Sequence, residues 1–408
     1  MTRALFAITI LSSCRIMAAA DDLGWPQFLG PLRNGSAGEE CVALPERFPE
    51  EPGLLWSVPV GSGHSGPVVS GDKVVLIHRL EDELVVDALD ALSGRSLWQQ
   101  KFPTSYRDDF GMDEGPRAVP AVADGRVFVH GADGVLLALD VQTGKLLWRV
   151  DTAAEQDSPQ GFFGRACSPL VVDGKVLIST GGKSAMTAFA VGSGNVVWST
   201  GDDESSYASP VMLNADIALA WLRNHLTTFA LGSGQVIDRQ RLRPSMEASV
   251  SAATPVRTDV GWFLSAEYDV GCSLWKISDE GRMEMTWQAD DLLNAHYATP
   301  VSHDGCIYGF HGRQERGMTL RCLNLQTKTI TWESPRTKGG TLLRIKDKLA
   351  VLTEEGEMWI VKAGPEKFET VLVAQVLRAN HRSHAAYARG IWYARDSEKL
   401  VAIRLAPQ

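Results

Sequence analysis

The chain has 408 residues, of which 44% are hydrophobic and 22% are charged, so it has the composition of a globular protein. Its formal net charge at neutral pH is -9. An acidic chain of this kind lacks the excess of basic residues that proteins use to bind nucleic acid or anionic lipid.

The first twenty residues have the layout of a secretory signal peptide. Arg3 precedes the apolar run 4–11, and small residues lead up to Ala20. We expect cleavage near Ala20 and a periplasmic or secreted mature protein. An alternative stays open, because residues 11–14 also resemble a lipoprotein box that would anchor the protein through Cys14. The apolar run itself is too short to span a bilayer.

A strand–turn–strand pattern recurs along the chain. Three copies align without a gap, at residues 88–98, 138–148 and 188–198, and each ends in tryptophan. A fourth copy ends at Asp238 instead, and weaker copies end at Trp287 and Trp332. The six ends are 50, 50, 40, 49 and 45 residues apart. A period in this range predicts a propeller or a solenoid.

Two positions of the repeat have a clear structural role. The glycine of each Ser-Gly or Thr-Gly pair supplies the positive φ that a tight hairpin turn requires. The tryptophan is large and flat, and we expect it to pack between neighbouring blades. We assign these roles to Trp56, Trp98, Trp148, Trp198, Trp287 and Trp332, and to Gly94, Gly144, Gly194 and Gly234.

A second hairpin, apolar on both faces, precedes each copy and completes a four-stranded blade. Its starts are Pro67, Pro120, Pro169, Pro210, Pro255 and Pro300, with weaker starts near Leu342 and Ala385. The last blade lacks a fourth strand, and residues 53–58, with Trp56 at the repeat position, look like that strand. The sequence therefore predicts an all-β fold, an eight-bladed β-propeller of four-stranded antiparallel blades whose ring is closed by an N-terminal strand. We divide the chain into a leader (1–20), an N-terminal arm (21–52) and a single propeller (53–408).

The blade motif carries a resemblance. The pattern Ala-x-Asp-x-x-Thr-Gly-Lys-x-x-Trp, complete at residues 138–148, resembles the repeat of pyrroloquinoline-quinone-type (PQQ-type) propellers. Such repeats occur in quinoprotein alcohol dehydrogenases and in the outer-membrane assembly lipoprotein propeller. The segments 25–35, 115–120 and 294–300 are similar to a subgroup of exported PQQ-binding-like proteins. The resemblance covers the chain from about Trp25 to Leu405, and it implies the fold more directly than the function.

The resemblance also bears on catalysis. The dehydrogenases carry a vicinal cysteine disulfide over the cofactor and hold calcium with a Glu, an Asn and an Asp. No two cysteines are adjacent in this sequence, and we find no match for the calcium ligands. We therefore expect an exported, non-catalytic, monomeric binding or scaffold module for a protein, a peptide or a small anionic ligand in the cell envelope, with no cofactor. The alternative is a small periplasmic PQQ-dependent alcohol or sugar oxidoreductase that also binds calcium.

A candidate binding site follows from the topology. The loops that lead into the inner strands converge on one end of the propeller axis, and convergent polar groups at a concave opening favour ligand binding. Arginine and histidine donors there favour a carboxylate or a phosphate. The alternative, that these side chains only satisfy loop carbonyls, stays open. The predicted mouth residues are His64, Arg117, Arg165, Tyr207, His296, Tyr297, Lys338, His381 and Arg382.

Other chemical motifs are weaker. Residues 61–66 fit G-x-G-x-x-G, but they precede a strand instead of opening a helix, so we predict no dinucleotide site. The acidic residues Asp108, Asp109, Asp113 and Glu114 could ligate calcium, although we expect a solvated acidic loop. The scattered cysteines Cys41, Cys167, Cys272, Cys306 and Cys322 are expected to be small buried side chains and not a disulfide framework.

Overall fold

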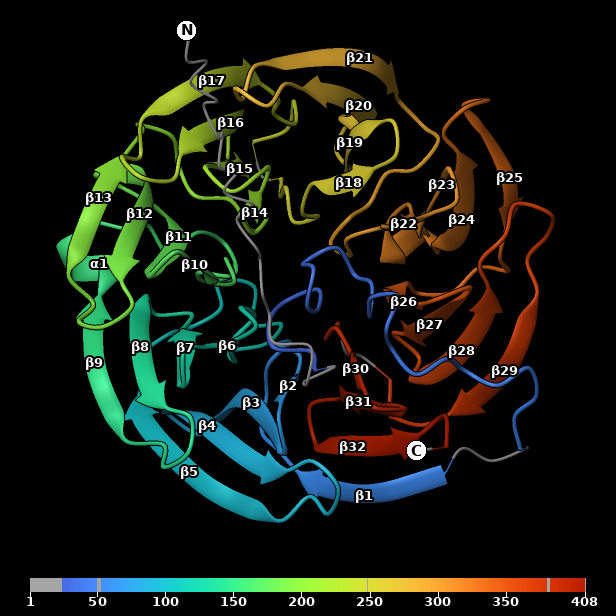
Figure 1. Ribbon diagram of the computed structural model, residues 1–408, viewed down its shortest axis with the longest axis horizontal. Coiled ribbons are helices and arrows are strands. Elements are labelled where there is room, and N and C mark those ends of the chain that lie inside the picture. The colour runs from blue at the N-terminus through green and yellow to red at the C-terminus, as the bar shows by residue number, and fades with distance from the viewer. Residues whose placement is uncertain (1–23, 50–52, 248, 380–381, 408) are drawn as a thin grey trace, which may run out of the picture.

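The computed structural model describes residues 24–49, 53–247, 249–379 and 382–407. Within these residues the strands form eight sheets of four antiparallel strands each, arranged as blades around a common centre (Figure 1). Helical structure there is limited to the turn α1 (Thr152–Glu155) and the 3-10 turn η1 (Gln314–Arg316), and no described helix could span a membrane. The predicted eight-bladed fold is confirmed. The leader, with Cys14 and Ala20, lies outside the described residues.

The first four blades each run in chain order from a short inner strand to an outer strand. Blade 1 consists of β2 (Val68–Ser70), β3 (Lys73–Leu80), β4 (Glu83–Asp90) and β5 (Ser96–Pro103). Blade 2 consists of β6 (Ala121–Ala123), β7 (Arg126–His130), β8 (Val135–Asp140) and β9 (Leu146–Asp151). Blade 3 consists of β10 (Leu170–Val172), β11 (Lys175–Gly181), β12 (Ser184–Ala190) and β13 (Val196–Thr200). Blade 4 consists of β14 (Val211–Met212), β15 (Ile217–Trp221), β16 (His225–Ala230) and β17 (Val236–Arg241).

Blades 5 to 7 follow the same order, and blade 8 combines the two ends of the chain. Blade 5 consists of β18 (Val256–Thr258), β19 (Gly261–Ala266), β20 (Gly271–Ile277) and β21 (Met283–Ala289). Blade 6 consists of β22 (Val301–His303), β23 (Cys306–His311), β24 (Thr319–Asn324) and β25 (Thr329–Glu333). Blade 7 consists of β26 (Gly340–Ile345), β27 (Lys348–Thr353), β28 (Glu357–Lys362) and β29 (Thr370–Gln375). Blade 8 consists of β30 (Ala386–Ala388), β31 (Ile391–Arg395), β32 (Lys399–Arg404) and β1 (Gly53–Pro59).

Burial follows the position of a strand within its blade. The second strand of blade 1, β3, is buried at all but its last residue, because both of its faces pack against other blades. The outer strand β9 instead alternates, with Trp148 and Val150 buried and their neighbours at least partly exposed. The core is therefore a series of apolar layers between blades, and the five described cysteines lie in it as free, buried thiols.

The repeat tryptophans join each blade to the next. Trp98 of blade 1 lies on the turn of blade 2, where its Nε1 donates a hydrogen bond to the carbonyl of Val141 at 3.1 Å. A Cβ on Gly144, at φ 71°, would lie only 2.6 Å from the Trp98 ring. The glycine is therefore required both for the turn and for the approach of the indole. The same indole–glycine contact joins Trp56 to Gly94, Trp148 to Gly194 and Trp198 to Gly234.

The other two repeat tryptophans, Trp287 and Trp332, contact the turn of the next blade in a different way. Trp332 keeps the hydrogen bond, to the Gly364 carbonyl at 2.7 Å. Trp287 is only half-buried, and Lys328 occupies the turn position of glycine at φ 61°. The Lys328 ammonium lies 4.9 Å from the centre of the Trp287 ring, so a cation–π contact replaces close packing at this junction.

The ring closes through the N-terminal strand, as predicted. Strand β1 pairs with β32 in antiparallel register from Gly53 with Arg404 to Pro59 with Lys399. Trp56 of β1 then donates to the Ala91 carbonyl of blade 1 at 3.0 Å. Segments from opposite ends of the chain thus form one sheet (Figure 1).

The arm before β1 crosses the centre of the ring. Trp25 is 2% exposed and exchanges two backbone hydrogen bonds with Val69 of blade 1. The buried Arg33 donates to the carbonyls of Ser168 and Pro169 at 2.7 and 3.0 Å and to that of Pro210 at 2.7 Å. These carbonyls belong to blades 3 and 4, so one guanidinium joins inner segments that lie far apart in the sequence. The arm is therefore docked and occupies part of the axial space.

Candidate functional site

The loops that lead into the inner strands enclose a cavity of about 690 Å³ at one end of the propeller axis. Phe28 of the arm contributes to its lining and contacts His384 edge-on, with ring centres 5.0 Å apart. The arm thus limits the depth of the cavity without filling it. We call this space the mouth cavity.

Six of the nine predicted mouth residues line the mouth cavity. They are His64, Arg117, Tyr207, His296, Tyr297 and Arg382. Arg165 does not line it, because its guanidinium turns into the protein and donates to Ser158 and to the Ala132 carbonyl. Lys338 also lies elsewhere, with an exposed side chain. His381 lies outside the described residues.

Arg117 is bound within its own loop. Its Nη1 donates to the Tyr106 hydroxyl at 3.3 Å, and its Nη2 donates to the Asp113 carbonyl at 3.0 Å. Nη2 also lies 3.4 Å from the carboxylate of Asp108. Its Cζ stands 5.5 Å from the centre of the Phe163 ring, in cation–π contact. Both terminal nitrogens therefore already have partners, so Arg117 organises the wall of the cavity.

Asp108 organises the same loop from inside, and its side chain is fully buried. It accepts backbone N–H hydrogen bonds from Phe110, Met112 and Asp113 at 3.2, 2.8 and 2.9 Å. Burial raises the pKa of Asp108. The hydrogen bonds from these N–H groups lower it by a larger amount, so the net pKa lies below the usual value. The expectation of a solvated acidic loop is therefore wrong for Asp108. No group of three or more His, Cys, Asp or Glu suited to a metal occurs among the described residues.

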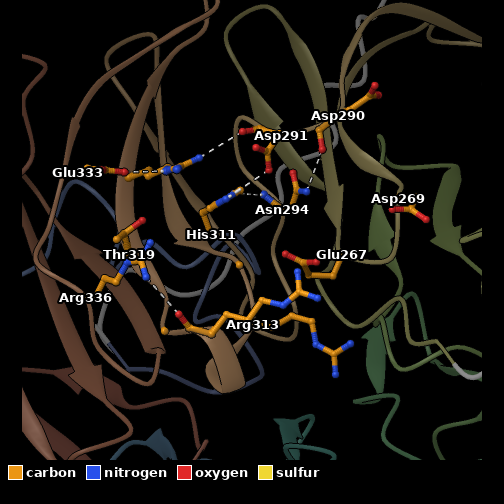
Figure 2. A pocket seen from close by; sticks show the side chains of 14 residues that line it. Glu267, Asp269, Asp290, Asp291, Asn294, His311, Arg313, Thr319, Glu333 and Arg336 are labelled. Atoms are coloured by element: carbon orange, nitrogen blue, oxygen red, sulfur yellow. Dashed lines mark hydrogen bonds and ion pairs between the residues drawn. The ribbon is translucent and has the colours of Figure 1, made fainter.

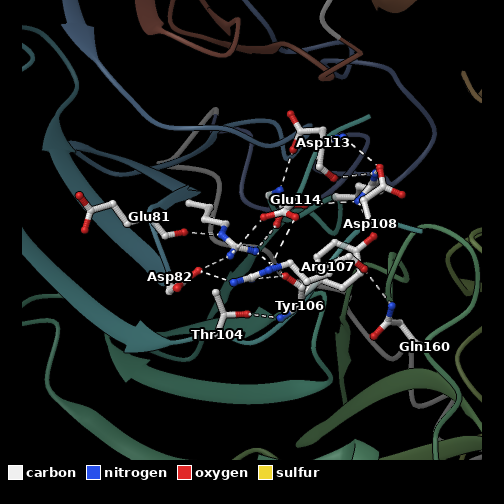
Figure 3. A network of polar contacts seen from close by, with 12 residues as sticks. Glu81, Asp82, Thr104, Tyr106, Arg107, Asp108, Asp113, Glu114 and Gln160 are labelled. Atoms are coloured by element: carbon white, nitrogen blue, oxygen red, sulfur yellow. Dashed lines mark hydrogen bonds and ion pairs between the residues drawn. The ribbon is translucent and has the colours of Figure 1, made fainter. Parts of the chain in front are cut away.

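A network of ion pairs fixes the loop 104–118 to blade 1. The buried Arg79 donates to the Tyr106 and Glu114 carbonyls at 2.7 and 3.1 Å. It also pairs with Asp82 at 2.7 Å, and Asp82 in turn pairs with Arg107 at 2.9 Å. Figure 3 shows Asp82 of blade 1 close to Arg107 and Glu114 of the loop. The wall of the mouth cavity is therefore held by charges of a neighbouring blade.

Arg382 differs from the other cations of the mouth. Its Nε donates to the Glu354 carboxylate at 3.1 Å, and the Tyr297 hydroxyl donates to the same oxygen at 2.6 Å. Its Cζ lies 5.3 Å over the Tyr297 ring. Burial raises the pKa of Glu354, although Arg382 and Tyr297 oppose this effect. Among the described residues, neither Nη1 nor Nη2 of Arg382 has a hydrogen-bond partner, so both remain available to a ligand.

His296 and Tyr268 form the wall next to Arg382. The Nδ1 of His296 lies 2.8 Å from the Gln314 side-chain oxygen, and its Nε2 lies 3.0 Å from the Tyr268 hydroxyl. Burial lowers the pKa of His296 to about 4, so the ring is neutral at pH 7. The Cζ of Arg313 stands 5.0 Å over the Tyr268 ring. This wall is neutral and aromatic, with arginines along its edge.

The opposite wall is an apolar lip that the sequence did not reveal. Phe110 and Met112 are 58% and 54% exposed. Phe110 packs against Phe162 and Phe163, with ring centres 6.0 and 5.3 Å apart. The Tyr207 hydroxyl accepts the backbone N–H of Phe163 at 3.1 Å and fixes the lip to blade 4. These residues lie in irregular loops between blades, where no periodic pattern identifies them.

The fold and the mouth cavity define a class of protein, the PQQ-type-repeat propeller with a ligand-sized cavity at one end of its axis. The chain belongs to the family described as outer membrane protein assembly factor BamB. The model of this family matches residues 82–334, which is more than half of the chain. The predicted PQQ-type resemblance is therefore confirmed.

Curated relatives of two kinds match parts of the chain. A 1-butanol dehydrogenase (cytochrome c) from Thauera butanivorans is 36% identical over 36% of this chain and 21% of its own length. The outer membrane protein assembly factor BamB from Shewanella oneidensis is 29% identical over 37% of this chain and 36% of its own length. The chain thus matches about a fifth to about a third of these relatives.

Solved structures share the fold. BamB from Moraxella catarrhalis superposes with a TM-score of 0.62 at 16% identity, over 86% of this chain and 99% of that one. The quinohemoprotein alcohol dehydrogenase from Comamonas testosteroni superposes with a TM-score of 0.69 at 12% identity, over 94% of this chain and 81% of that one. At these identities the likeness concerns the fold alone.

Proposed function

We propose that the chain is an exported, non-catalytic propeller of the cell envelope that binds a segment of another protein, a peptide or a small anionic ligand in its mouth cavity. The observation that carries this proposal is Arg382, whose two terminal nitrogens have no partner in the described part of the chain and lie beside an open aromatic cavity. A guanidinium with both Nη groups available suits a carboxylate or a phosphate.

The apolar lip supports a ligand with an apolar part. Exposed apolar side chains that gather on one surface mark interaction sites more often than scattered ones do. Phe110 and Met112 stand at the same opening as Arg382. Membership of the assembly-factor family is consistent with a protein as the ligand. Signal cleavage near Ala20, or attachment through Cys14, remains part of this proposal.

The alternative is a PQQ-dependent alcohol or sugar oxidoreductase, which the partial match to 1-butanol dehydrogenase favours. The described residues do not fit the cofactor of that class. The acidic side chains that line the mouth cavity are Glu315 and Glu354, and each is bound to an arginine. They provide no cluster for calcium, and the described cysteines are free thiols without a disulfide.

Site-specific photocrosslinking tests the binding function. Benzoylphenylalanine replaces Phe110 in one variant and Leu92, which is 57% exposed in a turn of blade 1, in a control variant. We expect a discrete envelope adduct from position 110 and none from position 92. Adding Arg382→Met should reduce the adduct about tenfold, as expected for the loss of a charged hydrogen bond. Equal adducts from both positions, or an adduct unaffected by Arg382→Met, would contradict the proposal.

Calorimetric titration with PQQ, with and without calcium, separates the two functions. A binding module gives no saturable heat in either condition. Tight, calcium-dependent binding that Arg382→Met abolishes would instead support the oxidoreductase and would place the cofactor in the mouth cavity.

A further inference from the structure

A second cavity, of about 800 Å³, lies between blades 5 and 6 on the side of the mouth. Its walls come from the β19–β20 turn, the segment after β21 and the segment between β23 and β24. Charged side chains from both blades point into this space (Figure 2). We call it the blade 5/6 groove.

Several charges in the blade 5/6 groove are already paired. Arg321 lies 3.2 Å from Glu333, and Arg313 lies 3.1 Å from Glu315. Glu267 has no ion pair among the described residues, although it is only partly exposed. Burial raises the pKa of Glu267, and the nearby Asp291 carboxylate raises it further, whereas a backbone hydrogen bond at Tyr268 and the charges of Arg313 and Arg316 lower it. Glu267 is therefore a partly desolvated carboxylate that two arginines influence from a distance but that forms no direct ion pair within the described part of the chain.

The carboxylate of Asp291 is 87% exposed and forms no ion pair with a lysine or an arginine of the described residues. His311 Nε2 lies 3.6 Å from this carboxylate, and Arg321 donates to the Asp291 carbonyl at 3.3 Å. Burial lowers the pKa of His311, so this ring is neutral at pH 7 and does not offset the aspartate charge. A cation placed between Glu267 and Asp291 would relieve their mutual repulsion. Figure 2 shows both carboxylates on the walls of the groove.

The blade 5/6 groove adjoins the mouth cavity, because Arg313 lines both. The residues between the two spaces are held by a tight turn in which Tyr268 and Asp269 have φ of 61° and 66°. Two successive side chains in this left-handed region are uncommon. The turn directs Tyr268 into the mouth cavity and Glu267 into the groove. One ligand can therefore contact both sides of this turn.

We infer that the mouth cavity and the blade 5/6 groove together bind one extended polypeptide segment that carries an acidic group, an apolar side chain and a basic side chain. The acidic group binds Arg382, the apolar side chain packs on the lip of Phe110 and Phe163, and the lysine or arginine lies between Glu267 and Asp291. This inference rests on the proposed binding function. A small anion would occupy only the mouth, whereas a polypeptide carries opposite charges along one chain.

Selection from a random heptapeptide library on the immobilised full chain tests the inference. We expect the selected peptides to contain an acidic residue, an aromatic or aliphatic residue and a basic residue. Selection on Arg382→Met should lose the acidic residue, and selection on Glu267→Gln should lose the basic one. Glu284→Gln, an equal charge change on the exposed face of β21, should leave the selected sequences unchanged.

A double-mutant cycle then locates the basic residue. One selected peptide is synthesised with its lysine or arginine, and again with norleucine at that position. We expect norleucine and Glu267→Gln each to weaken binding about tenfold, and their combination to weaken it no further. The thermal unfolding midpoint of each variant checks that it is folded.

The outcomes separate the inference from the function on which it rests. Peptides that depend on Arg382 but carry no basic residue, or effects of Glu267→Gln and norleucine that multiply, would overturn the extended site and leave the mouth function standing. A library that yields no peptide dependent on Arg382 would overturn the extended site together with the binding of a protein segment or peptide in the mouth.

Discussion

At the residue scale, each regular blade junction requires a glycine, because a larger side chain in the turn would collide with the indole that packs on it. The turn glycines have positive φ, and an indole from the preceding blade covers them. A Cβ at Gly144 would meet the Trp98 ring at 2.6 Å, whereas a Cβ at Gly174, φ 69°, would meet nothing within 4 Å. These two glycines share a backbone conformation and differ in their surroundings.

Substituting these glycines separates backbone strain from packing. Gly174→Ala should lower the free energy of unfolding by about 1 kcal/mol, the cost of a left-handed non-glycine residue. Gly144→Ala adds the displacement of the Trp98 indole and should cost about 3 kcal/mol in total. Denaturant unfolding measures both values. Equal losses would show that the indole contact does not constrain the turn.

Buried histidines make stability depend on pH. His130 is 1% exposed, and burial lowers its pKa to about 4. Its Nδ1 lies 2.9 Å from the Cys167 carbonyl, and its Nε2 has no hydrogen-bond partner among the residues that the structure describes. A second proton on this ring would therefore be buried without an acceptor. The unfolded chain, in contrast, binds that proton near pH 6.5.

The pH effect has a definite sign. Between pH 6.5 and 4 the unfolded chain binds more protons than the folded protein, so the free energy of unfolding falls as the pH falls. The His130 contribution amounts to about 2 to 3 kcal/mol by pH 4.5. His130→Asn keeps an N–H donor near the Cys167 carbonyl and removes the titration. Urea unfolding at pH 7 and pH 4.5 should show a smaller loss in this variant, and an equal loss would contradict the assignment.

At the element scale, the strands were predictable and the loops of the mouth were not. Apolar runs and turn glycines are local signals, and they identified the hairpins that end in Trp98 and Trp148. The availability of a mouth arginine instead depends on partners. Arg117 is bound by Asp108 and Tyr106, whereas Arg382 meets Glu354 through one nitrogen only. Contacts of this kind join loops from different blades, and an alignment of the repeats does not reveal them.

The loop 104–118 should depend on Arg79 of blade 1. Arg79→Met keeps a long apolar stem but removes the bonds to the Tyr106 and Glu114 carbonyls and to Asp82. We expect amide hydrogen exchange in residues 104–118 to rise at least about tenfold, because the loss of charged hydrogen bonds favours local opening. Lys101→Met removes the exposed pair with Glu83 and should change exchange in this loop little. Unchanged exchange in Arg79→Met would assign the loop geometry to Asp108 alone.

At the scale of the whole molecule, the arm and strand β1 connect parts of the chain that the repeat pattern treats as separate. The closure of blade 8 by β1 was predicted, because an open ring would expose sheet edges. The path of the arm was not predicted, since residues 24–49 have no repeat and Arg33 binds carbonyls more than 130 residues away. The arm and the mouth loops thus lie at the propeller axis, whereas the closing strand β1 lies at the outer edge of blade 8 (Figure 1).

Proline substitutions in two equivalent outer strands measure what closure contributes. Ser57 follows Trp56 in β1 and pairs with Val401, and Ser199 follows Trp198 in β13 and pairs with Thr187. Proline removes a backbone donor and distorts the strand at either position. In blade 3 the strand stays tethered to its own hairpin, so the damage is local. In blade 8 the detached strand separates the two ends of the chain and opens the ring.

Ser57→Pro should therefore lower the thermal unfolding midpoint more than Ser199→Pro, and it should increase amide exchange in β31 and β32 as well as in β1. The difference arises because β1 can re-pair with β32 only after closing a loop of more than 300 residues, whereas β13 is joined to β12 by a short turn. Differential scanning calorimetry and hydrogen exchange report the two effects separately. Equal midpoints would mean that the packing between blades and the docked arm hold the ring without β1.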